Sequence, residues 1–511
     1  MTIPAAQRET ARFLSRLAGA APLETHISAV FLGRDTAWKL KKAVSFPYLD
    51  FTSLAARHRF LLRELALNGP AAPGLYRDVV PLVRRPDGSL ALDEQGEPIE
   101  WLLRMARVPE EDFLDRIADS GRLTSRLARA LGRAIARYHA GLAPLSGIDH
   151  LASLQRLVGE IRISALAAGL PESEILAWEK TLLEALQARS DWLVRRAEQG
   201  FVRRAHGDLH LGNLCLWQGE PVPFDALEFD EQLASVDLGY DLAFLLMDLE
   251  ARGDRANANR VLNSYIAWRG DFGLVGGLPP FLSLRAMVRA HVQASRGLQK
   301  DALCFLAAAN GFLHPVAPTL IAVGGLPGSG KSTLADALAP RIGAAPGALV
   351  MSSDVLRKRR HGVSPETRLP DAAYTPAENL AVHASLMAAA IEAASLGHAV
   401  IADATFLDPA NRAAIEAAAS SAGIPFLGLW LEAPLPILEN RVKARGAAAE
   451  PDPSDATQAV LRQAATSFGR EGSPVPSQGW PKGWHRLHAD GPSGVILAAA
   501  LQLAKPGTEP C

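Results

Sequence analysis

The residues best suited to chemistry form a glycine-rich segment, Gly-Leu-Pro-Gly-Ser-Gly-Lys-Ser, at positions 325–332. It fits the phosphate-binding pattern G-x-x-x-x-G-K-[ST], and it lies between an apolar run and a helical stretch, as this pattern requires. Glycines let consecutive backbone amides face an anion, and the following helix N-terminus adds partial positive charge. The segment therefore predicts a nucleotide-phosphate site made by Gly325, Leu326, Pro327, Gly328, Ser329, Gly330, Lys331, Ser332 and Thr333.

Four side chains are assigned roles around these phosphates. Lys331 is expected to reach the β- and γ-phosphates, and Ser332 to supply an oxygen to Mg²⁺. Asp403 ends the apolar run 400–403, so it is expected near the same ion, although an ordinary strand-end carboxylate is the alternative. Asp354 follows another apolar run and could accept a proton from an acceptor hydroxyl, or else cap a helix. ATP and Mg²⁺ are the cofactors that this set predicts.

A second constellation precedes the first in the chain. His-Gly-Asp-Leu-His-Leu-Gly-Asn at 206–213 reproduces the Asp-to-Asn spacing of a kinase catalytic loop. Such a loop presents Asp208 to an acceptor hydroxyl and brings Asn213 back to a metal ion on the phosphates. Asp225, which follows the strand-like Val-Pro-Phe, takes the place of the second Mg²⁺ ligand. The two segments together predict a second site for phosphoryl transfer.

A lysine and a glutamate complete this second site upstream. Lys39 in Thr-Ala-Trp-Lys is expected to bind phosphates, and Glu64 on the following helix to pair with it. Lys41 points to the same strand face and is the alternative lysine. Residues 24–28, Glu-Thr-His-Ile-Ser, contain no G-x-G-x-x-G, so hydroxyls or other amides would have to hold the β-phosphate there.

Two other residues are assigned no chemistry. Asp271 opens a literal Asp-Phe-Gly, but it lies too far beyond Asn213 to share one phosphate with the catalytic loop, so we reject it as a metal ligand. His139, on a helical stretch, is expected to be a packed core histidine rather than a ligand.

The elements that must position these residues fall into two groups. Strands at 26–32 and 36–41, a helix at 52–68, and strands at 79–83, 90–92 and 100–106 predict a small sheet lobe. Helical periodicity at 110–140 and 237–308 predicts a helical lobe after it. Two prolines at 310–319 interrupt the chain, and strands then alternate with helices. These strands, expected at 320–324, 348–352, 398–402, 426–431 and 485–488, predict a parallel sheet.

Composition leaves the partners to be argued from the sites. The chain has 511 residues, 48% of them hydrophobic, and a formal net charge of -1, which gives no overall reason to expect nucleic acid or an anionic membrane. Its three cysteines show no C-x-x-C spacing, which excludes a disulfide framework and a cysteine zinc site as main themes. The N-terminus lacks a secretory signal, so a cytoplasmic protein is expected.

The two constellations resemble two known families. Over about residues 20–300 the chain resembles the aminoglycoside phosphotransferases in their broad sense, through the 206–213 loop, Asp225, and Asp237-x-x-x-Asp241. Residues 319–505 resemble P-loop small-molecule and polynucleotide kinases, through GLPGSGKST, SSDVLRK, IADATF and Arg441-x-x-x-Arg445. This second resemblance implies that Asp354 activates the acceptor and that Arg441 or Arg445 neutralises phosphate.

The expected fold is therefore an α+β kinase-like bilobal domain at 1–314 followed by an α/β P-loop domain with a parallel sheet at 317–511. The leading hypothesis is a bifunctional ATP-dependent kinase that phosphorylates hydroxyl groups of small molecules. One alternative is a P-loop kinase or ATPase regulated by a non-catalytic front domain, and another is a kinase of 5′-hydroxyl nucleic-acid ends. The basic run 357–361 could contact nucleic acid, but a solvated helix face is the preferred interpretation.

Overall fold

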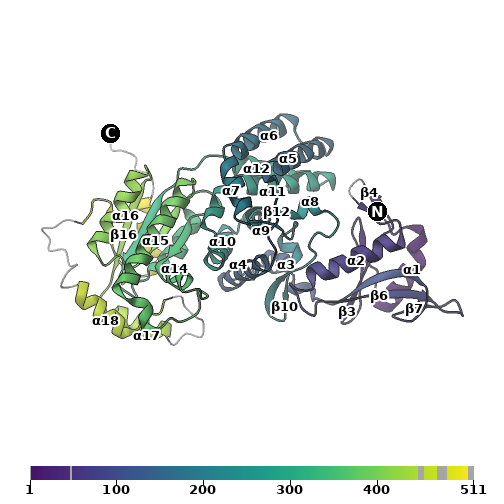
Figure 1. The fold of residues 1–511 in the computed structure, drawn as a ribbon, viewed down its shortest axis with the longest axis horizontal. Helices are drawn as coiled ribbons and strands as arrows, with labels where there is room; N and C mark the ends of the chain where they lie inside the picture. The colour runs from purple at the N-terminus through teal and green to yellow at the C-terminus, as the bar shows by residue number, and fades with distance from the viewer. Residues whose placement is uncertain (1, 47–48, 447–453, 469–479, 505–511) are drawn as a thin grey trace. The chain divides into compact units, whose positions relative to one another are not determined.

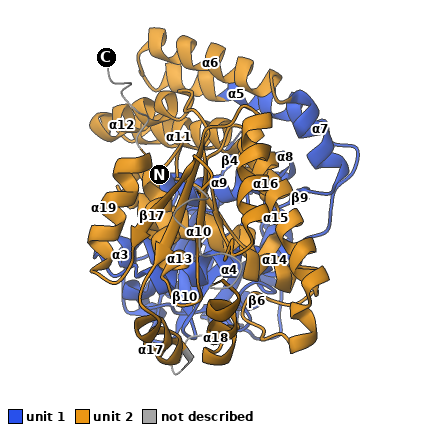
Figure 2. Cartoon of the chain, turned by 90° about the vertical axis from the view of Figure 1, so that its left-hand side faces the viewer, with its two compact units in different colours: residues 1–160, 190–248 blue, residues 161–189, 249–511 orange. Residues whose placement is uncertain are grey.

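The computed structural model describes residues 2–46, 49–446, 454–468 and 480–504, and the structural statements below concern these residues (Figure 1). Cys511 lies outside them. The chain forms two compact units, one of residues 1–160 and 190–248 and the other of residues 161–189 and 249–511 (Figure 2). Each unit is described by itself, and the boundary at 314–317 stays a prediction.

The first unit begins with an antiparallel sheet, because short alternating runs separated by turn residues pair as hairpins. Helix α1 (Arg8–Ala18) precedes it and α2 (Leu54–Asn68) follows its first strands. Phe31, Leu40 and Leu102 are fully buried in its core. The strand order is β1-β2-β3-β8-β6-β7, with β1 (Leu23–Glu24), β2 (Ser28–Leu32), β3 (Thr36–Lys41), β6 (Tyr76–Arg84), β7 (Leu90–Leu92) and β8 (Pro98–Ala106). The predicted sheet lobe is confirmed.

The rest of the first unit is mainly helical, as the periodicity predicts. Two short antiparallel pairs, β10 with β11 and β12 with β9, surround the 206–213 loop. The elements are α3 (Leu114–Asp119), α4 (Ser125–Ala140), α5 (His150–Ala167), α7 (Ser190–Glu198), β9 (Val202–Arg204), β10 (Leu214–Trp217), β11 (Glu220–Pro223), α8 (Glu231–Ala234), β12 (Ser235–Asp237) and α9 (Leu238–Ala251). The last residues of α5 and of α9 belong to the second unit.

The second unit contains a five-stranded parallel sheet in the order β14-β15-β13-β16-β17. Helices cover it, and Val323, Ile401 and Leu429 are buried in its core. This confirms the predicted α/β domain. Its strands are β13 (Leu320–Gly325), β14 (Leu349–Ser352), β15 (Val400–Asp403), β16 (Phe426–Glu432) and β17 (Trp484–His488). Its helices are α13 (Lys331–Leu338), α14 (Ser353–Arg360), α15 (Pro376–Ser395), α16 (Pro409–Ser421), α17 (Leu435–Gly446), α18 (Gln458–Ser467) and α19 (Ser493–Ala504).

Four further helices, α6 (Glu172–Gln187), α10 (Arg255–Arg269), α11 (Leu278–Ser295) and α12 (Gln299–Gly311), belong to the second unit. Two asparagines of α10 pair with the outer edge of β14, which would otherwise present unpaired backbone groups. Asn263 Oδ1 accepts from the Val350 amide at 2.7 Å, and Asn259 Nδ2 donates to the Ala348 carbonyl at 3.0 Å. Side-chain amides of α10 thus extend the sheet at its edge.

Removing this edge pairing should destabilise the parallel sheet. The double variant Asn259→Ala/Asn263→Ala in the full chain is expected to lower the free energy of unfolding of the P-loop region by about 1–3 kcal/mol, because edge groups lose their partners. Urea unfolding, monitored by limited proteolysis, measures this change in the free energy of unfolding. The control is Asn310→Ala, whose amide donates to Leu306 within its own helix. A fragment 317–511 lacks α10 and should be similarly weakened; equal stability of fragment and full chain would contradict the prediction.

Candidate functional sites

The front site joins three charged side chains from separate elements. Lys39 lies on β3, Glu64 on α2, and Asp225 directly after β11. Lys39 Nζ lies 2.6 Å from Glu64 Oε1 and 2.5 Å from Asp225 Oδ1. The structure therefore brings together the lysine expected to bind phosphates, the glutamate expected to pair with it and one of the two expected metal ligands.

A second lysine extends the network. Lys41 Nζ lies 2.8 Å from Glu64 Oε2 and also contacts Glu228, and all three side chains are buried. Burial acts to lower the pKa of Lys41 and to raise that of Glu64, but the opposite charges outweigh it. The pKa of Lys41 is therefore raised and that of Glu64 lowered. Glu64 is held from two sides, so it stays oriented toward Lys39.

Sequence reasoning missed Glu228. Burial is the main cause that raises the pKa of its carboxyl group, against the attraction of Lys41. The pattern Asp225-x-x-Glu228, two carboxylates after a strand, was the feature that could have indicated it.

The catalytic loop is closed by Asn213, which ends the short 3-10 helix η3 (Leu211–Asn213). Its amide nitrogen donates to Asp208 Oδ2 at 3.0 Å and to the Asp208 carbonyl at 2.9 Å. The amide oxygen is then the atom that can turn toward a cation. His206 is buried and contacts the Phe224 carbonyl, and burial lowers its pKa, which favours the neutral ring.

Two aspartates on α9 hold this loop from behind. Asp241 accepts from the amides of His206 at 3.1 Å and Gly207 at 2.8 Å, and Asp248 accepts from the Leu211 amide at 3.1 Å. Their spacing along one helix face was the available pattern, but the sequence alone assigned Asp248 no role. His139 is fully buried with Nε2 3.1 Å from Asp241, which confirms its prediction as a packed histidine.

The metal-type carboxylate of the front site sits on unusual backbone. Asp225 has φ +61°, a conformation that non-glycine residues rarely adopt and that is found at functional sites. Its amide donates to Tyr76 Oη at 2.9 Å, which holds this turn. With Asn213, Asp225 offers oxygen ligands of the kind Mg²⁺ prefers. The residues present fit a Mg²⁺-nucleotide.

The turn before β2 offers less than expected. The Ser28 amide donates to Thr25 Oγ1 at 3.0 Å, so the hydroxyl of Thr25 stabilises the turn. The Ser28 hydroxyl is buried and has no hydrogen-bond partner among the described residues. The Ser28 hydroxyl is therefore inaccessible in this structure, and hydroxyls or other amides as the groups that hold the β-phosphate stay a prediction.

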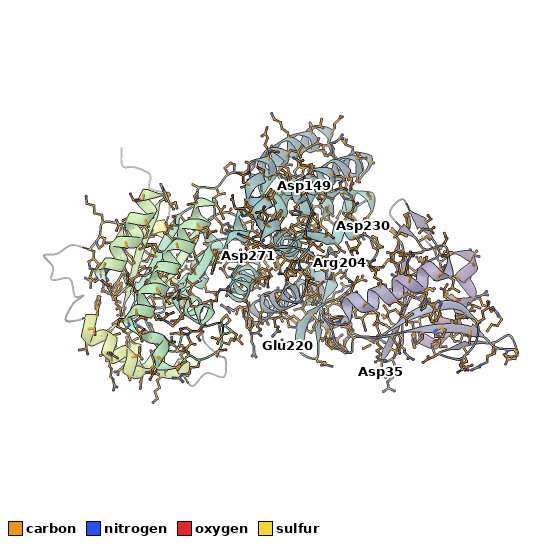
Figure 3. All side chains as sticks on the ribbon, viewed as in Figure 1. Asp35, Asp149, Arg204, Glu220, Asp230 and Asp271 are labelled. Atoms are coloured by element: carbon orange, nitrogen blue, oxygen red, sulfur yellow. The ribbon has the colours of Figure 1, made fainter. Side chains whose placement is uncertain are left out.

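The rejected Asp-Phe-Gly lies in the other compact unit. Asp271, labelled in Figure 3, precedes the 3-10 helix η4 (Phe272–Gly277) and is buried. The aspartate that contacts Lys39 is Asp225.

The rear site lies where β13 meets α13. Parallel pairing sets Val323 opposite Asp403, so the P-loop and the end of β15 share one edge of the sheet. Ser332 Oγ donates to Asp403 Oδ2 at 2.6 Å. Gly328 has φ +82°, and a Cβ there would lie 2.7 Å from the Leu438 carbonyl. A hydroxyl and a carboxylate at this distance, beside glycine amides, fit a Mg²⁺-phosphate.

Lys331 begins α13 and folds over the loop, where Nζ donates to the Leu326 carbonyl at 3.0 Å. Burial lowers its pKa, while Asp403 and Asp354 oppose the shift. The two candidate arginines of α17 differ: Arg445 donates to the Ala456 carbonyl at 2.9 Å, whereas Arg441 lines a cavity of about 350 Å³. That cavity is also lined by Ser329, Gly330, Thr333, Ser493 and Gly494.

Asp354 lies in the first turn of α14 rather than at its cap. Ser352 occupies the N-cap position, so the alternative role of Asp354 as a cap is wrong. Burial raises the pKa of Asp354, against a hydrogen bond from Ser454 and the charges of Lys331, Arg357 and Lys358. A partly buried carboxylate with a raised pKa near the P-loop lysine is suited to accept a proton.

The raised pKa predicts a pH effect. Asp354 must be ionised to act as a base. The acid limb of the pH profile of rear-site kcat/KM should therefore lie at a higher pH than the pKa of an ordinary aspartate would give. Because the pKa of Asp354 is higher in the folded protein than in the unfolded chain, the free energy of unfolding should also fall as the pH rises through this pKa. Lys358→Met removes a cation that lowers the pKa, so the limb should move to still higher pH. Exposed Lys443→Met is the control. If Lys358→Met leaves the acid limb of the profile at the same pH or moves it to lower pH, the assignment of Asp354 as the base is contradicted.

The basic run 357–361 is solvated only in part. Arg357 and Lys358 are buried, with 7% and 1% of their surface exposed, and Arg360 pairs with Glu378. The preferred interpretation of this run is therefore wrong for its first two residues. Their charges point inward, near Asp354.

Two family models match the chain. Residues 53–274 match the phosphotransferase enzyme family, and residues 320–470 match an AAA domain. The chain therefore joins a domain of the aminoglycoside-phosphotransferase type to a P-loop kinase domain, and both resemblances seen in the sequence are confirmed. This domain content supports phosphoryl transfer of the kinase type. No described helix is long and apolar enough to cross a membrane.

Two relatives align with almost the whole chain. An uncharacterized protein of Mycobacterium tuberculosis (strain ATCC 25618 / H37Rv) is 28% identical over 499 residues, 94% of each chain, and one of Mycobacterium bovis matches equally. Among solved structures, a glucosamine kinase is 17% identical (TM-score 0.38; 57% of this chain, 75% of that one). A GDP and kanamycin complex of APH(2")-IIia is 14% identical (TM-score 0.38; 60% and 99%). At TM-scores below 0.5 these similarities identify neither substrate nor mechanism.

Proposed function

We propose that the protein is a bifunctional ATP-dependent kinase, in which each site transfers the γ-phosphoryl group to a hydroxyl of a small molecule. The supporting observation is that each site has its own lysine and its own metal-type carboxylate. These are Lys39 with Asp225 in front, and Lys331 with Asp403 behind. A candidate base, Asp208 or Asp354, accompanies each set.

In the front site, the chain's residues divide the work. Asp208 accepts the acceptor's proton, and Asn213 fixes the orientation of Asp208 through its amide nitrogen. Lys39 exchanges its contact with Asp225 for the nucleotide phosphates, while Glu64 keeps it charged and in place. Asp241 and Asp248 hold the loop amides, so Asp208 needs little reorganisation.

In the rear site, Asp354 accepts the acceptor's proton and Lys331 follows the migrating phosphoryl group. Backbone amides of the P-loop and the N-terminus of α13 offset the phosphate charge. Arg441, which lines the adjacent cavity, is placed to add a further positive charge. Bound with ATP at either site, Mg²⁺ would neutralise charge between the phosphates; Asn213 and Asp225, or Ser332 and Asp403, would hold it.

A regulated P-loop kinase with a non-catalytic front domain is the second candidate. It is favoured by the buried Ser28 hydroxyl, since the turn before β2 offers the β-phosphate little support. The ion pairs that Lys39 forms with Glu64 and Asp225 oppose this second candidate, because they are the contacts expected of a catalytic site. For a kinase of 5′-hydroxyl nucleic-acid ends, burial of Arg357 and Lys358 removes the supporting basic face.

The test is ADP release by the whole protein across sugars, nucleosides, aminoglycosides and 5′-hydroxyl oligonucleotides. It is repeated with the front site silenced by Asp208→Asn and with the rear site silenced by Lys331→Ala. Bifunctional catalysis requires acceptor-dependent release in each single variant. Release that depends on Lys331 alone, with every acceptor, would support the regulated kinase instead.

A further inference from the structure

Three donors converge on one carboxylate beside the rear base. Asp455, between α17 and α18, accepts from Tyr374 Oη at 2.5 Å and from the Leu369 amide at 3.1 Å, and it lies 3.4 Å from Lys358 Nζ. The side chains of Lys358 and Asp455 are 1% and 10% exposed. An ammonium, a phenol and an amide around one carboxylate form an anion-binding position.

This position adjoins Asp354. Lys358 is among the charges that lower the pKa of Asp354, and the Asp354 charge helps raise that of Tyr374. Arg357 adds a second buried cation, with its guanidinium 4.7 Å above the Tyr374 ring and donating to the Ala373 carbonyl. Lys358 Nζ also donates to the Pro365 carbonyl at 3.2 Å, but Asp455 is the anion that offsets its buried charge.

The residue before Asp455 completes the pattern. The Ser454 hydroxyl hydrogen-bonds to the carboxylate of Asp354. Ser454 thus places its hydroxyl at the candidate base Asp354, and the next residue, Asp455, places its carboxylate in the anion-binding position. The Lys358 to Asp455 separation exceeds the roughly 2.7–2.9 Å of a strong charge-assisted bond, so this contact is loose.

We infer that Lys358, Tyr374 and the Leu369 amide bind an anionic group of the rear acceptor, and that Ser454 and Asp455 occupy the places of its hydroxyl and its anion. This rests on the proposed kinase function of the rear site and narrows its substrate. The acceptor is a small alcohol that carries a carboxylate, sulfate or phosphate group. Asp455 competes with it until the acceptor displaces the segment.

The test uses the full chain with saturating Mg²⁺ and a nonhydrolysable ATP analogue, so that nucleotide fills the phosphate sites. Sodium sulfate, inorganic phosphate and acetate are titrated at constant ionic strength, and the melting temperature is followed. The variants are Asp455→Ala, which removes the competitor, and Asp455→Ala/Lys358→Met, which also removes the cation. Replacing a buried ion pair by apolar groups is often neutral for folding, so the double variant is a usable control.

If Asp455 occupies the anion-binding position about nine-tenths of the time, only about a tenth of the protein is free to bind an anion there. Asp455→Ala should then bind at least one of these anions about tenfold more tightly than the unmodified protein. The double variant should lose that gain, and Tyr374→Phe in the Asp455→Ala background should lose part of it. A preference among the probes identifies the acceptor's anion. Equal responses of the single and double variants to all three probes would overturn the inference.

The same samples separate this idea from the kinase assignment. Rear turnover that depends on Lys331, together with no Lys358-dependent anion binding, overturns the anion position alone. Anion binding without Lys331-dependent turnover leaves the position standing and removes the kinase assignment.

Discussion

Lys331→Ala is expected to lower rear-site ATP turnover by about a thousandfold. Lys331 is partly buried at the start of α13, and its Nζ donates to the P-loop carbonyl of Leu326. In this enclosed loop its charge offsets the negative charge that develops on the migrating phosphoryl group. Alanine leaves the glycine amides and the Ser332 to Asp403 contact in place, so nucleotide should still bind, though more weakly.

The measurement is ADP release by the full chain in an Asp208→Asn background, which silences the front site. Lys443→Ala is the matched control, because this lysine is exposed on α17 and lies outside the candidate sites. Its turnover should stay within about twofold of the background, as expected for a surface substitution. Turnover that survives Lys331→Ala would remove the P-loop from the reaction.

The sequence predicts most of the fold because its signals are local. The strand pair 28–32 and 36–41 follows from alternation and a turn, and the parallel sheet follows from strands that alternate with helices. The P-loop needs consecutive glycines, so its residues are adjacent and visible. The sequence indicated Lys39, Glu64 and Asp225 for another reason. The resemblance to the aminoglycoside phosphotransferases supplied their order along the chain.

What the sequence could not show depends on contacts between distant segments. Glu228 becomes important because it meets Lys41, and Asn263 because α10 lies along the edge of β14. The charges of Arg357 and Lys358 suggested a solvated face, but the fold buries both, Arg357 against Tyr374 and Lys358 against Asp455. No periodicity in a basic helix reveals a carboxylate that arrives from about a hundred residues away.

The front site gives the second large effect. Asp208→Asn should lower phosphoryl transfer at least about a hundredfold while ATP still binds. Asparagine keeps the size of the side chain and can still pair with Asn213, which now donates to Asp208 Oδ2 at 3.0 Å. It cannot accept the acceptor's proton. Binding should persist because Lys39 and Asp225, which we propose to bind the nucleotide and its metal, are untouched.

Asp225→Asn should behave differently, and the contrast identifies each role. Asp225 lies 2.5 Å from Lys39 and offers an oxygen to the metal, so a neutral amide offsets less cationic charge at both. Affinity for Mg²⁺-ATP should therefore fall together with transfer. Asp271→Asn is the internal control: it alters the literal Asp-Phe-Gly, and neither affinity nor transfer should change in protein whose melting temperature is intact.

All three variants are made in the Lys331→Ala background, with nucleotide affinity and phosphoryl transfer measured separately. A working front kinase requires acceptor-dependent transfer in that background, lost with Asp208→Asn at unchanged affinity. If the background binds nucleotide but transfers to no acceptor, Asp208 has no proton to accept. The intact network of Lys39, Glu64 and Asp225 then serves binding alone, and the front domain acts as a nucleotide sensor for the P-loop kinase behind it.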